Sequence, residues 1–519
     1  MFATSASARL QKFAVEVTRR KNVPDMNLAG LLRRTASEVP DKPAVVPASG
    51  GPSPTYAELD AAADDIARGL VGRGVRPGDR VAIGMPNVPR FAPAYFGCLR
   101  AGAVVVPVNV MLTAAETARI LQDSEARIAL CASPFAEVVE QAVNDAGDIE
   151  VVTADAWPKR AERSGEPPDV EVSEDDLAVL AYTSGTTSEP KGVMLTHGNL
   201  AANLDQQMSI PDAHVTRDDV VFLALPLFHI FGLNVTLGLA VMNGATGILV
   251  ERFEPVAALR TIQSHRVTVL FGAPTMYSAW VNTPGADQYD LSSVRLAVSG
   301  AAPLSEDTLY SFEQIFGVKI YEGYGLTETA PTLTSNRMAD EPRPRSIGKP
   351  LPGVELRLVD DDGRDVELGD PGEIVVSGPN VFAGYWRRDE ETKRAFVDGW
   401  FKTGDVAVQD EDGYLYIVDR KRDLVLVSGF NVFPSEVEDA LLHSPKVKEA
   451  AVVGVPHPYT GEAVKAYVVL ADGVIASESE LIAEVESRLA RFKSPQSIEI
   501  VDSLPHVLTG KVLRRALRT

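Results

Sequence analysis

The chain has 519 residues, of which 45% are hydrophobic and 23% are charged, and its formal net charge is −21. This length and apolar content predict a globular protein with several domains and large buried cores, and they exclude fibrous and disordered chains. The negative charge argues against a nucleic-acid-binding protein, because it would repel nucleic-acid phosphates. No apolar run approaches the ~18 residues that span a bilayer, and the N-terminus lacks a hydrophobic signal region, so we expect a cytoplasmic protein without a transmembrane segment.

The first 25 residues form a basic, weakly amphipathic segment, with most of the positive charge between residues 9 and 21. We expect a disordered or docked tail there, and an oligomer contact or a membrane-surface helix is the open alternative. The only cysteines, Cys98 and Cys131, lack the spacing of metal ligands or of a disulfide framework. Both lie in apolar stretches, which predicts buried free thiols in a reducing compartment.

Apolar stretches of strand length alternate with helical patterns after this tail. Residues 80–85 predict a strand, residues 88–101 a helix and residues 103–107 a second strand, which together form a βαβ unit with parallel, buried strands. Further strand-like stretches follow at residues 128–130, 246–250, 267–271 and 295–298. We therefore expect an α/β protein whose large N-terminal domain contains doubly layered α/β sheets.

A loop rich in hydroxyls and glycines follows the apolar run at residues 177–180. It contains Thr183, Ser184, Gly185, Thr186, Thr187, Ser188, Glu189, Pro190 and Lys191. Small residues let backbone N–H groups turn toward a polyphosphate, and Lys191 adds a positive charge for the β- and γ-phosphates. The spacing differs from a Walker A loop, so another nucleotide-handling family is indicated. A plain surface turn is the structural alternative.

Four more polar motifs follow in chain order, at residues 321–328, 399–405, 419–423 and 508–511. Together with the loop, they resemble the motifs of the adenylate-forming superfamily, which includes firefly luciferase and peptide-synthetase adenylation domains. From about residue 28 onward the chain resembles its acyl-CoA synthetase branch, and residues 429–434 resemble bacterial fatty-acyl-CoA synthetases. Ser188 and Glu189 depart from the usual loop pattern, and we expect this departure to be harmless.

The resemblance implies an enzyme that uses ATP to convert a hydrophobic carboxylic acid, such as a fatty acid, to an acyl-adenylate. The acyl group would then pass to CoA, and AMP and pyrophosphate would be released. An aryl or polyketide-like acid stays open as the substrate. Two other functions also stay open: transfer of the acyl group to a carrier protein or a separate enzyme, and a non-catalytic protein that binds nucleotide or acyl ligands.

The resemblance also implies the nucleotide-binding residues. Lys511 would be the catalytic lysine, Thr327 would donate to the α-phosphate, and Glu328 would ligate Mg²⁺, which takes few protein ligands. Asp405 would accept both ribose hydroxyls, and Arg420 would contact the same region. The adenine slot would be lined by Gly300, Ala301, Ala302, Glu322, Gly323, Tyr324 and Gly325. The plain alternatives are a basic terminal helix for Lys511 and a turn cap for Asp405.

Residues 226–232 resemble the family's aromatic gate motif. We expect His229 to be a pocket wall or a gate that moves between half-reactions, rather than a proton-transfer base. The acyl pocket would be lined by His229, Phe231, Gly232, Phe271, Ala273, Gly325 and Ala330.

The patterning changes twice toward the C-terminus. Residues 353–419 show short alternating strands with Gly and Asp turns, which predict a β-rich subdomain within a large domain spanning residues 26–420. The resemblance makes residues 421–519 a smaller, mobile α+β lid, with a hinge within residues 419–423. In the lid, Ser428, Gly429 and Phe430 would pass the pantetheine arm of CoA, because Gly429 has no side chain to block it. A homodimer stays open.

Overall fold

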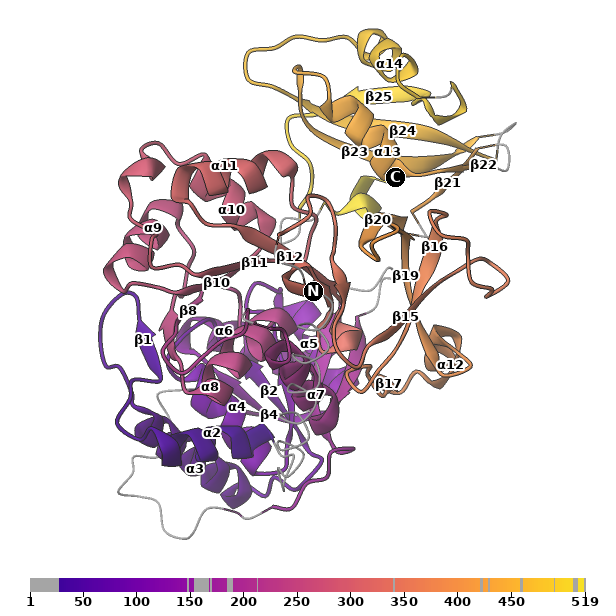
Figure 1. The fold of residues 1–519 in the computed structure, drawn as a ribbon. Coiled ribbons are helices and arrows are strands. Elements are labelled where there is room, and N and C mark those ends of the chain that lie inside the picture. The colour runs from indigo at the N-terminus through magenta and orange to yellow at the C-terminus, as the bar shows by residue number, and fades with distance from the viewer. Residues whose placement is uncertain are drawn as a thin grey trace, which may run out of the picture.

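The computed structural model describes residues 28–146, 149–153, 168, 170–183, 190–211, 213–338, 341–420, 423–427, 430–457, 461–489, 491–506 and 512–517. The α/β class expected from the sequence is confirmed, with two large mixed sheets, a smaller β-rich sheet and a C-terminal α+β unit (Figure 1). Within the described part of the chain, none of the helices combines the length and apolarity needed to cross a membrane.

The first sheet has seven strands in the order β17-β7-β6-β3-β2-β4-β5. Its strands are β2 (Arg80–Gly84), β3 (Val104–Pro107), β4 (Ala126–Cys131), β5 (Glu150–Thr153), β6 (Leu177–Thr183), β7 (Lys191–Thr196) and β17 (Gly384–Tyr385). The predicted βαβ unit is confirmed, since β2 and β3 pair in parallel and are joined by α4 (Phe91–Arg100). The neighbouring helices are α3 (Tyr56–Gly72), α5 (Ala114–Ser124) and α6 (Ser133–Ala146). Cys98 and Cys131 are buried, unpaired thiols in this region.

The second sheet has eight strands in the order β1-β9-β8-β10-β11-β12-β13-β14. They are β1 (Val45–Pro47), β8 (Val220–Leu223), β9 (Thr246–Leu249), β10 (Val269–Gly272), β11 (Leu296–Ser299), β12 (Ile320–Gly325), β13 (Thr332–Ser335) and β14 (Lys349–Pro350). The other helices of this part of the chain are α2 (Leu28–Glu38), α7 (His197–Met208), α8 (Leu239–Asn243), α9 (Pro255–Ser264), α10 (Pro274–Val281) and α11 (Glu306–Phe316), and α7 contacts β6 and β7 of the first sheet. One continuous core contains buried residues from this sheet and from the first, such as Phe271 and Val105.

The β-rich region follows, with strands β15 (Glu355–Val359), β16 (Gly372–Ser377), β18 (Phe396–Val397), β19 (Trp400–Gln409) and β20 (Leu415–Arg420). Its pairings are antiparallel, as expected from the turn-rich sequence. One excursion was not predicted. The two-residue strand β17 leaves this region to pair with β7 of the first sheet, and α12 (Asp389–Ala395) follows it directly.

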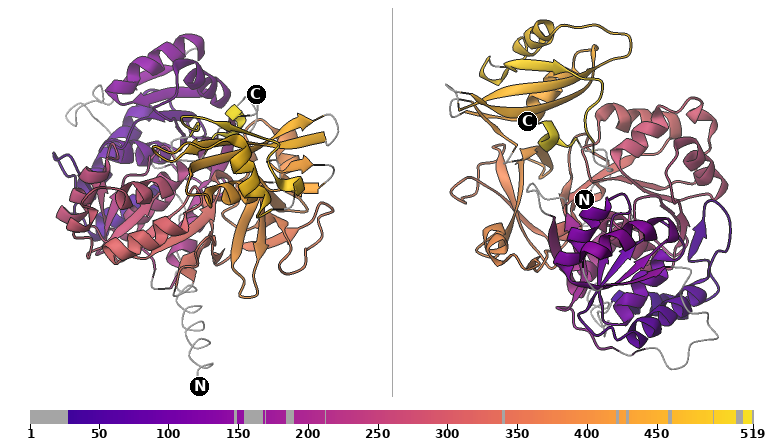
Figure 2. Two further views of the ribbon diagram at one scale, coloured as in Figure 1. Left: turned by 90° about the horizontal axis from the view of Figure 1, so that it is seen from above. Right: turned by 180° about the vertical axis from the view of Figure 1, so that it is seen from behind.

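The C-terminal unit has its own sheet and its own hydrophobic core, which includes Val425, Val437, Leu441 and Val464. Its elements are β21 (Val425–Val427), β22 (Phe430–Val432), α13 (Pro434–Leu442), β23 (Val447–His457), β24 (Gly461–Leu470), α14 (Glu478–Glu486) and β25 (Ser497–Ile500). In Figure 1 this unit lies above the β-rich sheet, and the right-hand view of Figure 2 shows the same arrangement from behind.

Candidate active site

The hydroxyl- and glycine-rich loop connects two antiparallel strands, β6 and β7. Thr183 and Lys191 face each other as the last register pair of these strands, so they fix the two ends of the loop. Both residues are partly buried. The other predicted phosphate-binding residues, Ser184, Gly185, Thr186 and Thr187, lie outside the described residues, together with Ser188 and Glu189.

Lys191 lies within a cluster of side chains that comes from three distant parts of the sequence. Its ammonium forms an ion pair with Glu391 of α12 and lies 5.4 Å from the centre of the Tyr385 ring. The Tyr385 hydroxyl donates a hydrogen bond of 2.9 Å to Glu328 Oε1. The predicted phosphate-binding lysine and the predicted metal ligand are therefore connected through one tyrosine.

Glu328 lies in the short 3₁₀ turn η5 (Thr327–Thr329), directly after β12. Its backbone carbonyl accepts a hydrogen bond from Phe382 N, and its side chain is partly buried. The described residues contain no group of three or more side chains that could hold a metal ion by themselves. A single carboxylate suits Mg²⁺, which keeps several waters and binds substrate phosphates, and does not suit a metal held in an all-protein cage.

Tyr324 and Asp405 meet although they come from different sheets. The Tyr324 hydroxyl donates a hydrogen bond of 2.7 Å to Asp405 Oδ2, and Asp405 is only 5% exposed. Asp405 of β19 lies opposite Arg420 of β20 in the register, although the Arg420 side chain is outside the described part. The residues predicted for adenine and for ribose therefore share one location, between β12 and β19.

The predicted adenine slot lies after the carboxyl end of β11 and along β12, which pair in parallel. Gly300 contacts the gate region, because a Cβ atom there would lie 3.1 Å from Phe231 Cε1. Ala301 has a left-handed backbone (φ 75°) and Ala302 is partly buried beside it. Gly323 approaches the neighbouring strand, since a Cβ atom there would lie 3.3 Å from Thr334 O.

Glu322 is a deeply buried carboxylate of this slot, with 5% exposure. Burial raises the pKa of Glu322 to about 8, and one hydrogen bond from Leu304 N offsets only part of this effect. At neutral pH the carboxyl group is therefore mostly protonated, and it can donate a hydrogen bond.

The aromatic gate residues surround the start of the π-helical segment η3 (Phe231–Gly238). His229 is exposed to solvent, and desolvation by the surrounding protein lowers its pKa. The Phe231 and Phe271 rings meet edge to face at 6.4 Å, and Phe271 and Ala273 are buried. The structure brings Phe231 and Phe271 together, and their role as a pocket wall stays a prediction.

Three other predicted pocket residues have clear packing roles. A Cβ atom at Gly232 would lie 2.2 Å from Pro226 O, and one at Gly325 would lie 1.8 Å from Pro331 O. Buried Ala330 has a carbonyl that accepts a hydrogen bond from Asn234 Nδ2 at 2.8 Å. Close backbone approach explains these two glycines without any acyl group, which the sequence pattern alone did not reveal.

A cluster of fully buried aromatic rings packs against one face of β10. Tyr277 packs against Trp280 at 5.4 Å and against Phe312 at 5.2 Å, and the Tyr277 hydroxyl donates to Val298 O. A Cβ atom at Gly272 would lie 2.9 Å from the Tyr277 ring. These rings therefore fill the side of β10 that Gly272 faces, whereas the Phe271 side chain points to the opposite face, toward Phe231.

The predicted lid residues are mostly outside the described part. Ser428, Gly429 and Lys511 are not described, and of Phe430 only the backbone is, in β22 opposite Val427. Sequence reasoning missed Tyr385 and Glu391 entirely. The acidic residues 389–391 are a typical first helical turn, and nothing local connects them with Lys191.

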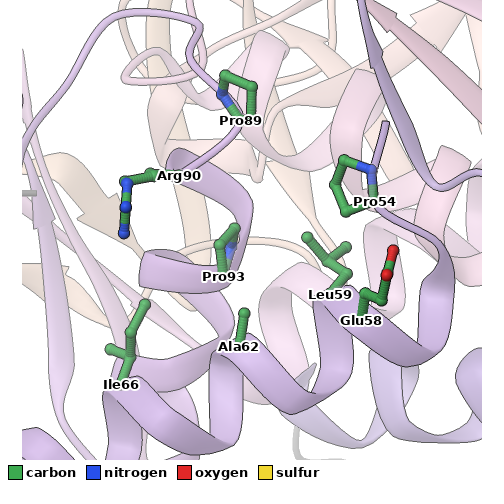
Figure 3. A pocket seen from close by; sticks show the side chains of 8 residues that line it. All are labelled: Pro54, Glu58, Leu59, Ala62, Ile66, Pro89, Arg90 and Pro93. Atoms are coloured by element: carbon green, nitrogen blue, oxygen red, sulfur yellow. The ribbon is translucent and has the colours of Figure 1, made fainter. Parts of the chain in front are cut away.

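A cavity of about 190 Å³ lies elsewhere, between α3 and α4 (Figure 3). It has apolar walls with Glu58 and Arg90 among the lining residues, and none of the predicted site residues lines it. It is therefore separate from the candidate site.

Comparisons with known proteins identify the family to which this chain belongs. The family model described as AMP-binding enzyme matches residues 32–386, and the model of the AMP-binding enzyme C-terminal domain matches residues 436–511. A feruloyl-CoA synthase from Amycolatopsis is 42% identical, over 90% of this chain and 94% of that protein. A long-chain-fatty-acid–CoA ligase from Escherichia coli is 36% identical, over 98% of this chain and 97% of that protein. The crystal structure of ATP-bound MatB from Rhodopseudomonas palustris superposes with a TM-score of 0.87 at 36% identity, over 94% of this chain and 98% of that protein.

Proposed function

Because this chain belongs to the family of AMP-binding enzymes, we propose that it activates a compact aromatic acid of the feruloyl type. Its reaction class is that of the acyl-CoA ligases: ATP and a carboxylic acid form an acyl-adenylate and pyrophosphate, and the acyl group then passes to CoA with release of AMP. The proposal concerns the acid and the residues that act on it.

The edge-to-face contact of Phe231 with Phe271 is the observation that carries this choice of acid. These two rings and buried Ala273 present an apolar, aromatic surface, and aromatic edges favour a flat ring. A long-chain fatty acid, the substrate named for the relatives that are 36% identical, is the second candidate.

In the first half-reaction a carboxylate oxygen of the acid attacks the α-phosphorus of ATP, and the bond to pyrophosphate breaks. Negative charge on the phosphoryl oxygens must be stabilised during this step. We assign that role to Lys191 and the loop beginning at Thr183, to Thr327 at the α-phosphate, and to Lys511. Glu328 would hold Mg²⁺ with phosphate oxygens and waters, and the bound ion would supply further positive charge.

Asp405 and Arg420 would hold the ribose, while Glu322 and Tyr324 would line the adenine slot. Because Tyr324 donates to Asp405, ribose hydroxyls would have to share or replace that hydrogen bond. In the second half-reaction the CoA thiol attacks the acyl carbonyl and AMP leaves. We propose that residues 421–519 rotate between the steps, which brings Ser428, Gly429 and Phe430 toward the pantetheine arm, and that His229 serves as the gate.

Carboxylate-dependent pyrophosphate release tests the choice of acid. We expect the highest kcat/KM with ferulate and related phenylpropenoic acids, compared with benzoates and saturated acids of increasing chain length. Thioester, detected by mass, should form only when CoA is present. A maximum at long saturated acids would contradict the aromatic proposal.

The same assay separates the remaining alternatives. Pyrophosphate release without thioester would indicate another acceptor, such as a carrier protein. We also propose a cytoplasmic location, because the buried thiols Cys98 and Cys131 fit a reducing compartment.

A further inference from the structure

The structure supports an inference about Glu391 that goes beyond the proposed function. We propose that Glu391 is a positioning residue that holds the Lys191 ammonium in the nucleotide-free enzyme and releases it to the triphosphate, so that Glu391 sets the affinity for ATP and for pyrophosphate. The inference rests on the proposed role of Lys191 as a phosphate ligand.

The first argument is the ion pair between Lys191 and Glu391. The two side chains are 22% and 34% exposed, so the pair is partly shielded from water and is screened less than a fully exposed pair. Lys191 also lies over the Tyr385 ring. A phosphate approaching the first residue of β7 would therefore meet an ammonium that already has a carboxylate partner.

The second argument is that Glu391 is held in place by backbone and aromatic contacts. Strand β17 pairs with β7, with Tyr385 opposite Val193, and Trp386 N donates to Gly192 O at 2.8 Å. The indole N–H of Trp386 donates to Asp123 O at 3.0 Å, which ties the segment to the end of α5. The start of α12, which lies next to β17 in Figure 1, is therefore fixed beside Lys191.

The third argument is electrostatic. Tyr385 lies between the two carboxylates, since its hydroxyl donates to Glu328 Oε1 at 2.9 Å and its ring lies beside the ammonium that pairs with Glu391. The two carboxylates thus belong to one electrostatic site around Lys191. Mg²⁺ bound with the nucleotide would offset the charge of Glu328. Glu391 would instead repel the β- and γ-phosphates and compete with them for Lys191.

Substituting Glu391→Gln tests this competition. We expect the KM for ATP in the adenylation half-reaction and the inhibition constant of pyrophosphate both to fall about two- to fivefold, the range of a partly exposed ion pair. The KM for the acid should stay unchanged. Glu391→Asp should stay near the parent protein, because it retains the charge.

Glu390→Gln is the matched control. It removes the same charge from the same helical turn, but Glu390 pairs with Lys393 at 2.8 Å and is 73% exposed. Equal effects of Glu390→Gln and Glu391→Gln would overturn the proposal, as would a higher KM for ATP in Glu391→Gln.

A second variant separates this inference from the proposed function. If Lys191→Met leaves the KM for ATP unchanged, the proposed role of Lys191 fails, whatever Glu391 does. If Lys191→Met raises the KM for ATP, then adding Glu391→Gln to the Lys191→Met variant should not lower this KM. A decrease of the same size in both backgrounds would show that Glu391 acts without Lys191 and would overturn the inference.

Discussion

At the scale of single residues, the pKa of Glu322 departs strongly from that of an ordinary surface carboxylate. It lies in the candidate adenine slot, and burial raises its pKa to about 8. The unfolded chain should release this proton near the ordinary value of 4.5. Between these two pH values the native state therefore binds a proton that the unfolded state does not, and stability must fall as the pH rises.

We expect Glu322→Gln to remove this pH dependence. The parent protein should lose up to ~1.4 kcal/mol of unfolding free energy per pH unit relative to the variant, from about pH 4.5 to about pH 8. Below and above this range the difference should be constant. Denaturant unfolding of both proteins between pH 5 and 9 measures it, and exposed Glu251→Gln is the control. Parallel stability curves would mean that Glu322 is ionised in the native state at pH 7.

Other residues show what the sequence could predict about the site. Tyr324 and Asp405 were assigned to one nucleotide from their motifs, and the structure brings them to 2.7 Å. Phe231 and Phe271 also meet as expected. Glu391 was missed because its contact with Lys191 depends on a two-residue strand crossing to another sheet, which leaves no local periodicity.

At the scale of elements, the βαβ units were predictable because buried parallel strands are continuous apolar runs, as in β2 and β3. The β12–β13 hairpin is less predictable, since the sequence pattern of its glycines suggests space for a ligand. Gly325 faces Pro331 O so closely that no side chain fits, and the register shifts at this point. The hairpin matters for the proposed function because Thr327 and Glu328 lie within its connection.

We expect Gly325→Ala to destabilise this hairpin. The added Cβ atom would lie 1.8 Å from a backbone oxygen that no side-chain rotation can move, so the cost should be at least about 1–3 kcal/mol. Gly323→Ala in the same strand is the control and should cost less, because its Cβ atom would lie 3.3 Å from Thr334 O. Chemical denaturation measures both variants. A smaller loss for Gly325→Ala than for Gly323→Ala would contradict this packing argument.

At the scale of the whole molecule, the C-terminal unit packs around a hydrophobic core that is separate from the core of the preceding domain. It buries its own core around Val437 and Val464. Its contacts with the preceding part include polar ones, such as the hydrogen bond from Ser435 Oγ to Val418 O and the exposed pair of Arg345 with Asp439 at 3.4 Å. Polar contacts of this kind are exchanged with water at little cost, which suits a unit that rotates.

The proposed rotation predicts that the two half-reactions can be separated by one substitution. Lys511→Ala should reduce acyl-adenylate formation by about 10²-fold or more, because a positive charge at the phosphoryl oxygens is lost. Thioester formation from supplied acyl-adenylate and CoA should be retained, since the rotated unit would present Gly429 instead of Lys511. Single-turnover assays of each step measure the split. Lys448→Ala, which removes an exposed lysine of the same unit, is the control and should leave both steps unchanged. Equal loss of both steps in Lys511→Ala would mean that one arrangement of the two parts serves the whole reaction.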